Sequence, residues 1–235
     1  YTRIEQGARI DSNYLLLTLL STLVAAIGLI EDNVAVVVGA MVIAPLLGPI
    51  IALAFGSSLG DGRMVLAGLR TAVAGLGLVF FISLLIGMAW PVDMHRGSLL
   101  IASTEILSRT DVGLDGMALA LASGAAAVLS LTTGLSSTLV GVMVAVALLP
   151  PAATMGMLFG AGHPELAIGA MLLLTVNVVC VIVAAKVVFM WRGVKPRTWY
   201  ERQKARQSSV LYGAFWLALF ALLVAVVLIR HRVMI

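Results

Sequence analysis

Residues Gly39 to Phe55 read Gly-Ala-Met-Val-Ile-Ala-Pro-Leu-Leu-Gly-Pro-Ile-Ile-Ala-Leu-Ala-Phe, an apolar run with two prolines and a glycine near its middle. Each proline lacks an amide hydrogen, and its ring clashes with the preceding turn, so one undisturbed helix cannot continue through this stretch. In lipid, the freed carbonyls find no water, so such a break persists only inside protein or beside a wet cavity. The sequence therefore predicts a broken helix at Pro45, Gly48 and Pro49, which we take as the functional centre.

A similar stretch of sequence occurs 102 residues later. Six of thirteen positions match, from Gly39 with Gly141 to Pro49 with Pro151. Pro150 and Pro151 stand where Gly48 and Pro49 stand, which predicts a second break in mid-span. The shift also carries the flanking apolar runs onto each other, 14–30 onto 116–132 and 64–90 onto 166–192. We predict two three-segment repeats with broken central helices, followed by one extra transmembrane helix.

The composition is that of a polytopic membrane protein. Of the 235 residues, 61% are hydrophobic and only 11% are charged, far from the balance of a soluble globular domain. The net charge of +4 fits basic residues beside anionic lipid better than nucleic acid, because the basic cluster abuts a spanning segment. We therefore predict an all-α chain and expect membrane lipid, not nucleic acid, as a partner.

The predicted organisation follows from the apolar runs and the polar connections between them. Arg70 and Lys186 lie near the ends of long apolar segments, where their side chains can snorkel to the headgroups as interfacial anchors. Within the inter-repeat connection, residues 98–108 are expected to form a short surface helix, with Leu99, Leu100, Ile106 and Leu107 dipping into the interface. The predicted parts are a polar lead-in (1–13), membrane repeat 1 (14–90), the inter-repeat connection (91–115), membrane repeat 2 (116–191), a basic cytoplasmic loop (192–209), and a final transmembrane helix with its tail (210–235).

Basic residues set the expected orientation. If every segment crosses, eleven of the fifteen Lys and Arg residues lie on the face of the N-terminus and four on the other, which places the N-terminus in the cytoplasm. If the two broken segments are re-entrant, the faces again divide eleven to four, so charge counting leaves both topologies open. We favour full crossing because the turns beside the broken segments are short and polar. Three crossings per repeat would invert the second repeat, as in transporters that hold substrate at paired discontinuous helices.

The run from Gly39 to Pro49, followed by Ser-Ser-Leu-Gly-Asp at residues 57–61, resembles the signature of a family of uncharacterised hydrophobic prokaryotic membrane proteins, domain of unknown function 389. The resemblance covers residues 13 to about 160. It implies a multi-pass prokaryotic membrane protein, sometimes preceded by a soluble N-terminal domain. It supplies no activity, so the functional argument rests on the residues themselves.

Candidate site residues fall into two groups. Neither break contains a charge, so a site there would use carbonyl oxygens and helix ends, which suit a small ion or polar solute. Proline kinks that only improve packing, and an interhelical hydrogen bond for Asn177, are the structural alternatives. The expected caps and turns are Glu31, Asp32, Asn33 and Asp61. The expected substrate pathway comprises Pro45, Gly48, Pro49, Pro150, Pro151, Thr154 and Asn177.

Two functions of different classes remain open from the sequence. The leading one is a secondary transporter or channel-like carrier for a small ion or polar solute. The other is a membrane anchor, sensor or scaffold that oligomerises and positions a soluble domain. No zinc-protease, P-loop or paired-aspartate motif is present, so we expect no enzyme activity, cofactor or metal. We also expect a homo-oligomer, because the last segment lacks an evident role in the core, and a location in the prokaryotic inner membrane.

Overall fold

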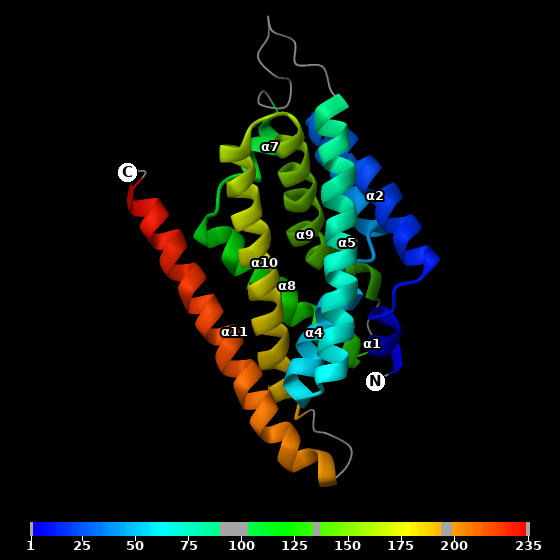
Figure 1. Ribbon diagram of the computed structural model, residues 1–235, viewed down its shortest axis with the longest axis vertical. Helices are drawn as coiled ribbons and strands as arrows, with labels where there is room; N and C mark the ends of the chain where they lie inside the picture. The colour runs from blue at the N-terminus through cyan, green and yellow to red at the C-terminus, as the bar shows by residue number, and fades with distance from the viewer. Residues whose placement is uncertain (1, 90–102, 134–136, 194–198, 234–235) are drawn as a thin grey trace, which may run out of the picture.

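The computed structural model describes residues 2–89, 103–133, 137–193 and 199–233 (Figure 1). Within these ranges every regular element is an α-helix. Five helices are long and apolar enough to cross a membrane, and one bent pair would make a sixth span. The chain is thus a helical membrane protein, and the predicted all-α class is confirmed.

The first half begins with a short helix, continues with a membrane-length one, and then turns through polar residues into the interrupted segment. Asp11 caps the membrane-length helix, since its carboxylate accepts a 2.7 Å hydrogen bond from the Tyr14 amide. The left-handed Gly60 (φ 72°) ends the interrupted segment in a conformation that favours glycine. The helices are α1 (Thr2–Gly7), α2 (Ser12–Ile30), α3 (Val34–Ile43), α4 (Leu47–Leu59) and α5 (Gly62–Ala89).

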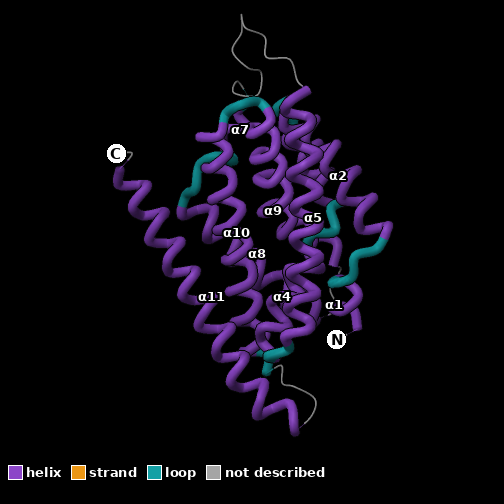
Figure 2. The backbone as a smooth tube through the Cα atoms, viewed as in Figure 1, coloured by secondary structure: helices purple, strands orange, loops and turns teal. Residues whose placement is uncertain are grey.

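The predicted break in the first half is confirmed at Pro45. The chain leaves the helical conformation after Ile43, resumes it at Leu47, and bends by 57° between the two helices. Figure 2 shows this interruption as a short loop beside α5, away from both ends of the bundle. Gly48 and Pro49 lie within the first turn of α4, where a missing amide hydrogen costs no helical hydrogen bond.

The second half contains a short helix, three helices of the bundle and a long outer helix. Pro164 occupies the first turn of the third bundle helix, a favoured proline position. These helices are α7 (Thr104–Ser108), α8 (Leu114–Thr133), α9 (Ser137–Gly160), α10 (Pro164–Trp191) and α11 (Trp199–Val233).

The predicted second break is wrong. Helix α9 runs without interruption from Ser137 to Gly160, with Pro150 and Pro151 inside it. Both prolines are buried, and Leu149 and Ala152 beside them are fully buried. Neighbouring helices can hold a proline-containing membrane helix together when the residues around the prolines are packed, which explains the continuity.

Close helix approach organises the centre of the bundle. A Cβ on Gly87 of α5 would overlap the carbonyl oxygen of Met157 in α9, and a Cβ on Gly156 would lie 2.5 Å from the Phe80 carbonyl oxygen. Gly124 of α8 likewise allows close approach to α10, since a Cβ there would lie 2.5 Å from the Val181 carbonyl oxygen. Gly77 of α5 differs, because nothing lies within 4 Å of a Cβ placed there.

The two halves pack reciprocally. Helix α5 of the first half packs against α9 of the second, and α10 of the second packs against α4 of the first. A Cβ on Gly169, near the start of α10, would overlap the Thr110 carbonyl oxygen just after α7, whereas Lys186 near its end contacts Ser57 in α4. Asp32, just before α3, bonds to α7 and so lies near the start of α10. The α3–α4 pair therefore starts beside one end of α10 and finishes, at Ser57, beside the other.

Three sequence expectations change in the second half. The connecting helix α7 is shorter than predicted, and Ile106 is fully buried in protein instead of dipping into the interface. Leu107 is 37% exposed, and Leu99 and Leu100 lie outside the described residues. Helix α11 does have a place in the core, since it packs on α4 and α10 along one side of the bundle (Figure 1).

Candidate functional site

The interruption between α3 and α4 is partly enclosed by protein, although Val42 and Ile43 just before it are 50% and 39% exposed. Ala44 and Leu46 are 8% and 2% exposed, and Pro45 between them is half-buried. Because Pro45 has no amide hydrogen, the Met41 carbonyl four residues earlier loses its helical donor. Leu46, the N-cap residue just before α4, provides no side-chain hydrogen bond to the helix. The break therefore brings the C-terminal end of α3 and the N-terminal end of α4 within a few residues of each other.

Helix α1 lies directly on the beginning of α4. A Cβ on Gly48 would lie 2.8 Å from the Gly7 carbonyl oxygen and 3.0 Å from the Gly7 Cα, so only glycine permits this contact. Ala8, which follows α1, is 5% exposed. The residues predicted to be a polar lead-in therefore cover the first turn of α4, next to Pro45.

Two hydrogen bonds hold this cover in place. The Thr71 hydroxyl of α5 donates to the Ala8 carbonyl at 2.5 Å, and the Tyr14 hydroxyl of α2 donates to the Thr71 carbonyl at 2.9 Å. Gly75, one turn further along α5, makes room for the Tyr14 ring, because a Cβ there would overlap its hydroxyl oxygen. The end of α1 is thus fixed to α2 and α5 as well as to α4.

Helix α9 carries the second group of predicted pathway residues. Thr154 is fully buried one turn after Pro150, and its Oγ1 has no hydrogen-bond partner among the described residues. Other helical hydroxyls bond to the carbonyl four residues back, namely those of Thr18, Thr22, Ser58, Ser123 and Thr175. A buried hydroxyl that forgoes this bond is a usual place for ordered water or an ion.

Apart from Pro45, which stands at the break, the predicted pathway residues belong to three helices that pack on one another, α4, α9 and α10. Asn177 is 6% exposed in α10, and α9 packs against α10, α3 and, more weakly, α4. Pro45, Pro49 and Thr154 thus lie on mutually packed elements, although only Pro45 stands at a break. Either role assigned to Asn177, an interhelical bond or the lining of a pathway, is compatible with its burial.

Of the predicted caps, two act as expected. The Asn33 side chain accepts from the Val36 amide at 3.3 Å and caps α3. The Asp61 carboxylate accepts from the Arg63 and Met64 amides at 3.0 and 3.2 Å and caps α5. Glu31 instead ends α2 as its C-terminal cap residue.

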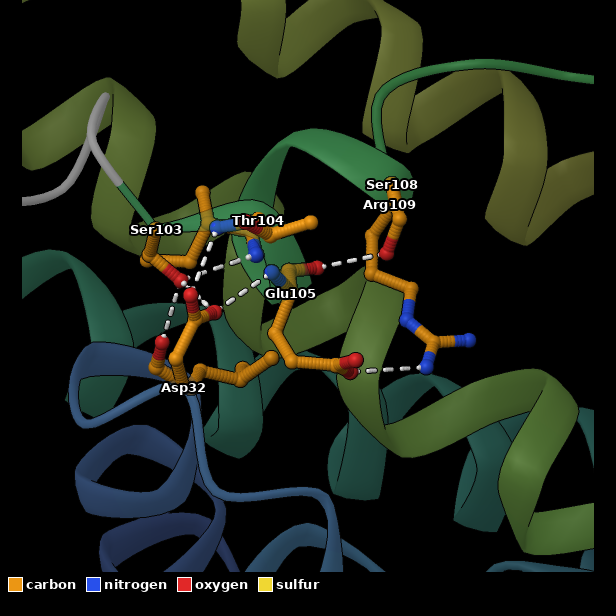
Figure 3. Close-up of polar contacts among 8 residues, drawn as sticks. Asp32, Ser103, Thr104, Glu105, Ser108 and Arg109 are labelled. Carbon is orange, nitrogen blue, oxygen red and sulfur yellow. Dashed lines mark hydrogen bonds and ion pairs between the residues drawn. The ribbon is translucent and has the colours of Figure 1, made fainter.

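Asp32 does not cap α3 but reaches α7 (Figure 3). It adopts a left-handed conformation (φ 55°), and its carboxylate accepts from the amides of Glu105 at 2.7 Å and Thr104 at 3.1 Å. The Ser103 hydroxyl lies 2.8 Å from the same carboxylate and 2.6 Å from the Leu29 carbonyl, so its single hydrogen serves one acceptor at a time. The amide of Glu105 first, then the hydroxyl of Ser103, lower the pKa of Asp32.

Sequence reasoning missed a buried polar cluster between α4, α10 and α11. Lys186, predicted as an exposed interfacial anchor, is 6% exposed, and its Nζ donates to the Ser57 carbonyl at 3.0 Å. The Trp216 Nε1 of α11 donates to the Ser57 hydroxyl at 3.3 Å. A lysine amid apolar residues was the available signal, but its partner lies 129 residues earlier and could not be identified from spacing.

Comparison with known proteins places the chain in a family. Residues 41–183 match the family described as domain of unknown function (DUF389). The chain belongs to this family. A protein of Methanocaldococcus jannaschii, named uncharacterized protein MJ0678, is similar to it, with 34% identity over 231 residues that cover 98% of this chain and 70% of that protein. No solved structure matches.

For this DUF389 protein, the Asp32 contacts predict an acid-sensitive attachment of α7. The pKa of Asp32 is lower in the folded state than its ordinary value of 3.8, so its stabilising contribution is complete above that value and is lost as the pH falls through the folded-state pKa. We expect the thermal midpoint of the purified protein to fall more steeply below about pH 4 than that of Asp32→Asn. The matched control, Glu31→Gln, alters the adjacent exposed carboxyl and should keep the steep fall. Equal acid profiles for Asp32→Asn and the unaltered protein would contradict the assignment.

Proposed function

We propose that the protein is a transporter, either a secondary carrier or a channel-like protein, which moves a small ion or polar solute past the α3–α4 break. The observation that carries this proposal is the 57° interruption at Pro45, which lies between the buried residues Ala44 and Leu46. Irregular backbone at membrane depth is tolerated where it is enclosed by protein or lines a pathway. Neither 34–59 nor 137–160 contains a charged residue, so neutral oxygen atoms would contact the solute.

The helix bounds support two repeats within this transporter. Adding 102 to the bounds of α5 (62–89) gives 164–191, which are the bounds of α10. The same shift carries α2 onto 114–132, against 114–133 for α8. Helix α5 packs on α9, and α10 packs on α4, so the last helix of each proposed repeat packs on the central segment of the other. This reciprocal packing is expected of two repeats with the same internal arrangement. Only the first central helix is broken, so the proposed repeats differ where the pathway would lie.

The arrangement of the broken pair also supports full crossing. Its start bonds to α7 and its end contacts Lys186, at opposite ends of the 28-residue α10, whose length is about 42 Å at 1.5 Å per residue. A re-entrant pair would return to the end that it left. With full crossing the second repeat is inverted, and the positive-inside rule places the N-terminus in the cytoplasm of a prokaryotic cell whose inner membrane holds the protein.

Further proposals concern partners. Between Val210 and Arg230, the outward side chains of α11 are largely apolar and exposed, including Leu211 at 70% and Ile229 at 63%, so they would contact lipid or a second copy. We keep the expectation of a homo-oligomer on that basis. We also propose that the protein is no enzyme and binds no nucleic acid.

Flux through liposomes tests the transport function. Purified protein would be reconstituted and screened with alkali cations, chloride, phosphate and small neutral polar solutes. Pro45→Ala restores an amide donor to the Met41 carbonyl and is expected to straighten the pair and lower flux about tenfold or more, corresponding to about 1.4 kcal/mol or more in the barrier. Pro164→Ala, at the first turn of α10, is the matched control and should leave flux unchanged.

Two outcomes would count against transport through the break. Flux that survives Pro45→Ala unchanged would remove the interruption from the mechanism. No flux for any solute, together with intact folding, would favour the anchor or scaffold function instead.

A further inference from the structure

The position of Lys186 needs an explanation beyond anchoring. Its side chain lies in the membrane-length helix α10, is 6% exposed, and points to α4. Ionisable residues inside membrane bundles are rare because moving a charge from water to this environment is costly, and those that occur usually have a role. The proposed transport function has so far assigned none to it.

The ammonium group meets the carbonyl end of α4. Gly60 and Asp61, which follow α4, both direct their amides to the Gly56 carbonyl. The next carbonyl, that of Ser57, accepts from Lys186 Nζ at 3.0 Å. Helix C-termini carry partial negative charge on carbonyls without helical donors, and these oxygens attract cations. Lys186 therefore acts as a tethered cation at a neutral-oxygen site.

Helix α11 closes this site. A Cβ on Gly213 would lie 3.3 Å from Lys186 Nζ, so the absence of a side chain there makes room for the ammonium group. Trp216, one turn later on α11, donates to the hydroxyl of the same Ser57. Phe55 of α4 and Phe189 of α10 stack edge-on beside the cluster, with centroids 5.0 Å apart. The carbonyl end of α4 is thus enclosed by residues of α4 itself, α10 and α11.

The described parts of the helices packed around this region carry few titratable groups. Helices α4 and α9 contain none, α8 contains only Asp115, in its first turn, and α5, which packs on α4, carries Arg63 and Arg70. The described titratable side chains of α11 are Tyr212 and Arg230, and α10 itself carries Glu165 and Cys180. Asp61 follows the end of α4 and caps α5. The described polar contact of the Lys186 ammonium group is with peptide oxygen.

We propose that the carbonyl end of α4 at Ser57 is a binding site for a monovalent alkali cation, which exchanges with the proton of Lys186. The Lys186 ammonium loses one N–H proton to water, and the metal cation forms a bond to the Ser57 carbonyl oxygen in its place. One positive charge leaves and one enters, so the net charge of the site is unchanged. The use of this exchange to couple solute movement rests on the proposed function, whereas cation binding itself does not.

Salt-specific stabilisation of Lys186→Gln is the first test. This variant removes the tethered cation and leaves the carbonyl end of α4. Its thermal midpoint at pH 7 is expected to rise by roughly 5 °C in NaCl or KCl relative to choline chloride at equal ionic strength. The unaltered protein and Lys186→Arg, which both retain a cation, should show no such difference. An equal response of Lys186→Gln to all three salts would overturn the proposal and leave Lys186 as a structural cap of α4.

The unaltered protein provides a second test that does not depend on the folding of a variant. At about pH 10, where lysine begins to lose its proton, the same NaCl or KCl preference over choline chloride should appear, and it should be absent at pH 7. Its absence at both pH values would overturn the proposal. Cation-specific stabilisation without any solute flux would support the cation site at Ser57 and contradict the transport function. Failure of the cation site can therefore be distinguished from failure of the transport function.

Discussion

Replacement of Gly87 by leucine is expected to destabilise the fold more than any other substitution considered. A Cβ at this position would overlap the backbone carbonyl oxygen of Met157, and backbone cannot rotate away as a flexible side chain can. Because α5 and α9 carry the closest contact between the two halves, the helices would have to separate. We expect a loss of about 3 kcal/mol or more, or roughly 10 °C in the thermal midpoint of the purified protein.

Gly77→Leu is the matched control for this prediction. It lies on the same helix, adds the same side chain, and has nothing within 4 Å of its Cβ. It should therefore leave the midpoint close to that of the unaltered protein. Similar midpoints for both variants would show that the α5–α9 contact is looser than described.

The second large effect is expected at Gly48. Leucine there would push against the Gly7 carbonyl and Cα and displace α1 from the beginning of α4. Ala8, now 5% exposed, would then become accessible. A cysteine probe, introduced as Ala8→Cys together with Cys180→Ala, should react with a water-soluble maleimide about ten- to a hundredfold faster when Gly48→Leu is added, as a 1–3 kcal/mol overpacking cost implies.

Gly39→Leu serves as the comparison for the probe experiment. Gly39 lies in α3, on the other side of the break, and a Cβ there meets no atom within 4 Å. Its labelling rate should equal that of the probe protein alone. If Gly48→Leu also leaves the rate unchanged, α1 does not lie over the break in solution.

Local chemistry explains what the sequence predicted correctly. Pro45 lacks an amide hydrogen and its ring clashes with the preceding turn, which favours the break observed there. Asn33 and Asp61 cap because their side chains reach amides two or three residues away. The family match at residues 41–183 agrees with the resemblance drawn from the motif around Pro45. These features need no knowledge of distant contacts.

Distant contacts explain which features could not be predicted from the sequence. The cost of Pro150 and Pro151 depends on how tightly other helices hold α9, which the local sequence does not contain. Asp32 bonds to residues more than 70 positions later, and Lys186 turns from the headgroups to α4 because a helix end lies within its reach. Snorkelling and helix capping compete for the same side chain, and only the packed bundle decides between them.

The reciprocal packing of the halves has a consequence for biosynthesis. Helix α4 is buried by α5, α10 and α11, and the latter two are synthesised more than 100 residues after it. While the ribosome still holds the second half, the carbonyl end of α4 has neither Lys186 nor Trp216 beside it. The interrupted segment therefore acquires its final surroundings only late in translation. We expect a truncated chain that stops before α10 to be recognised by membrane quality-control proteases, even though it already contains three membrane-length helices.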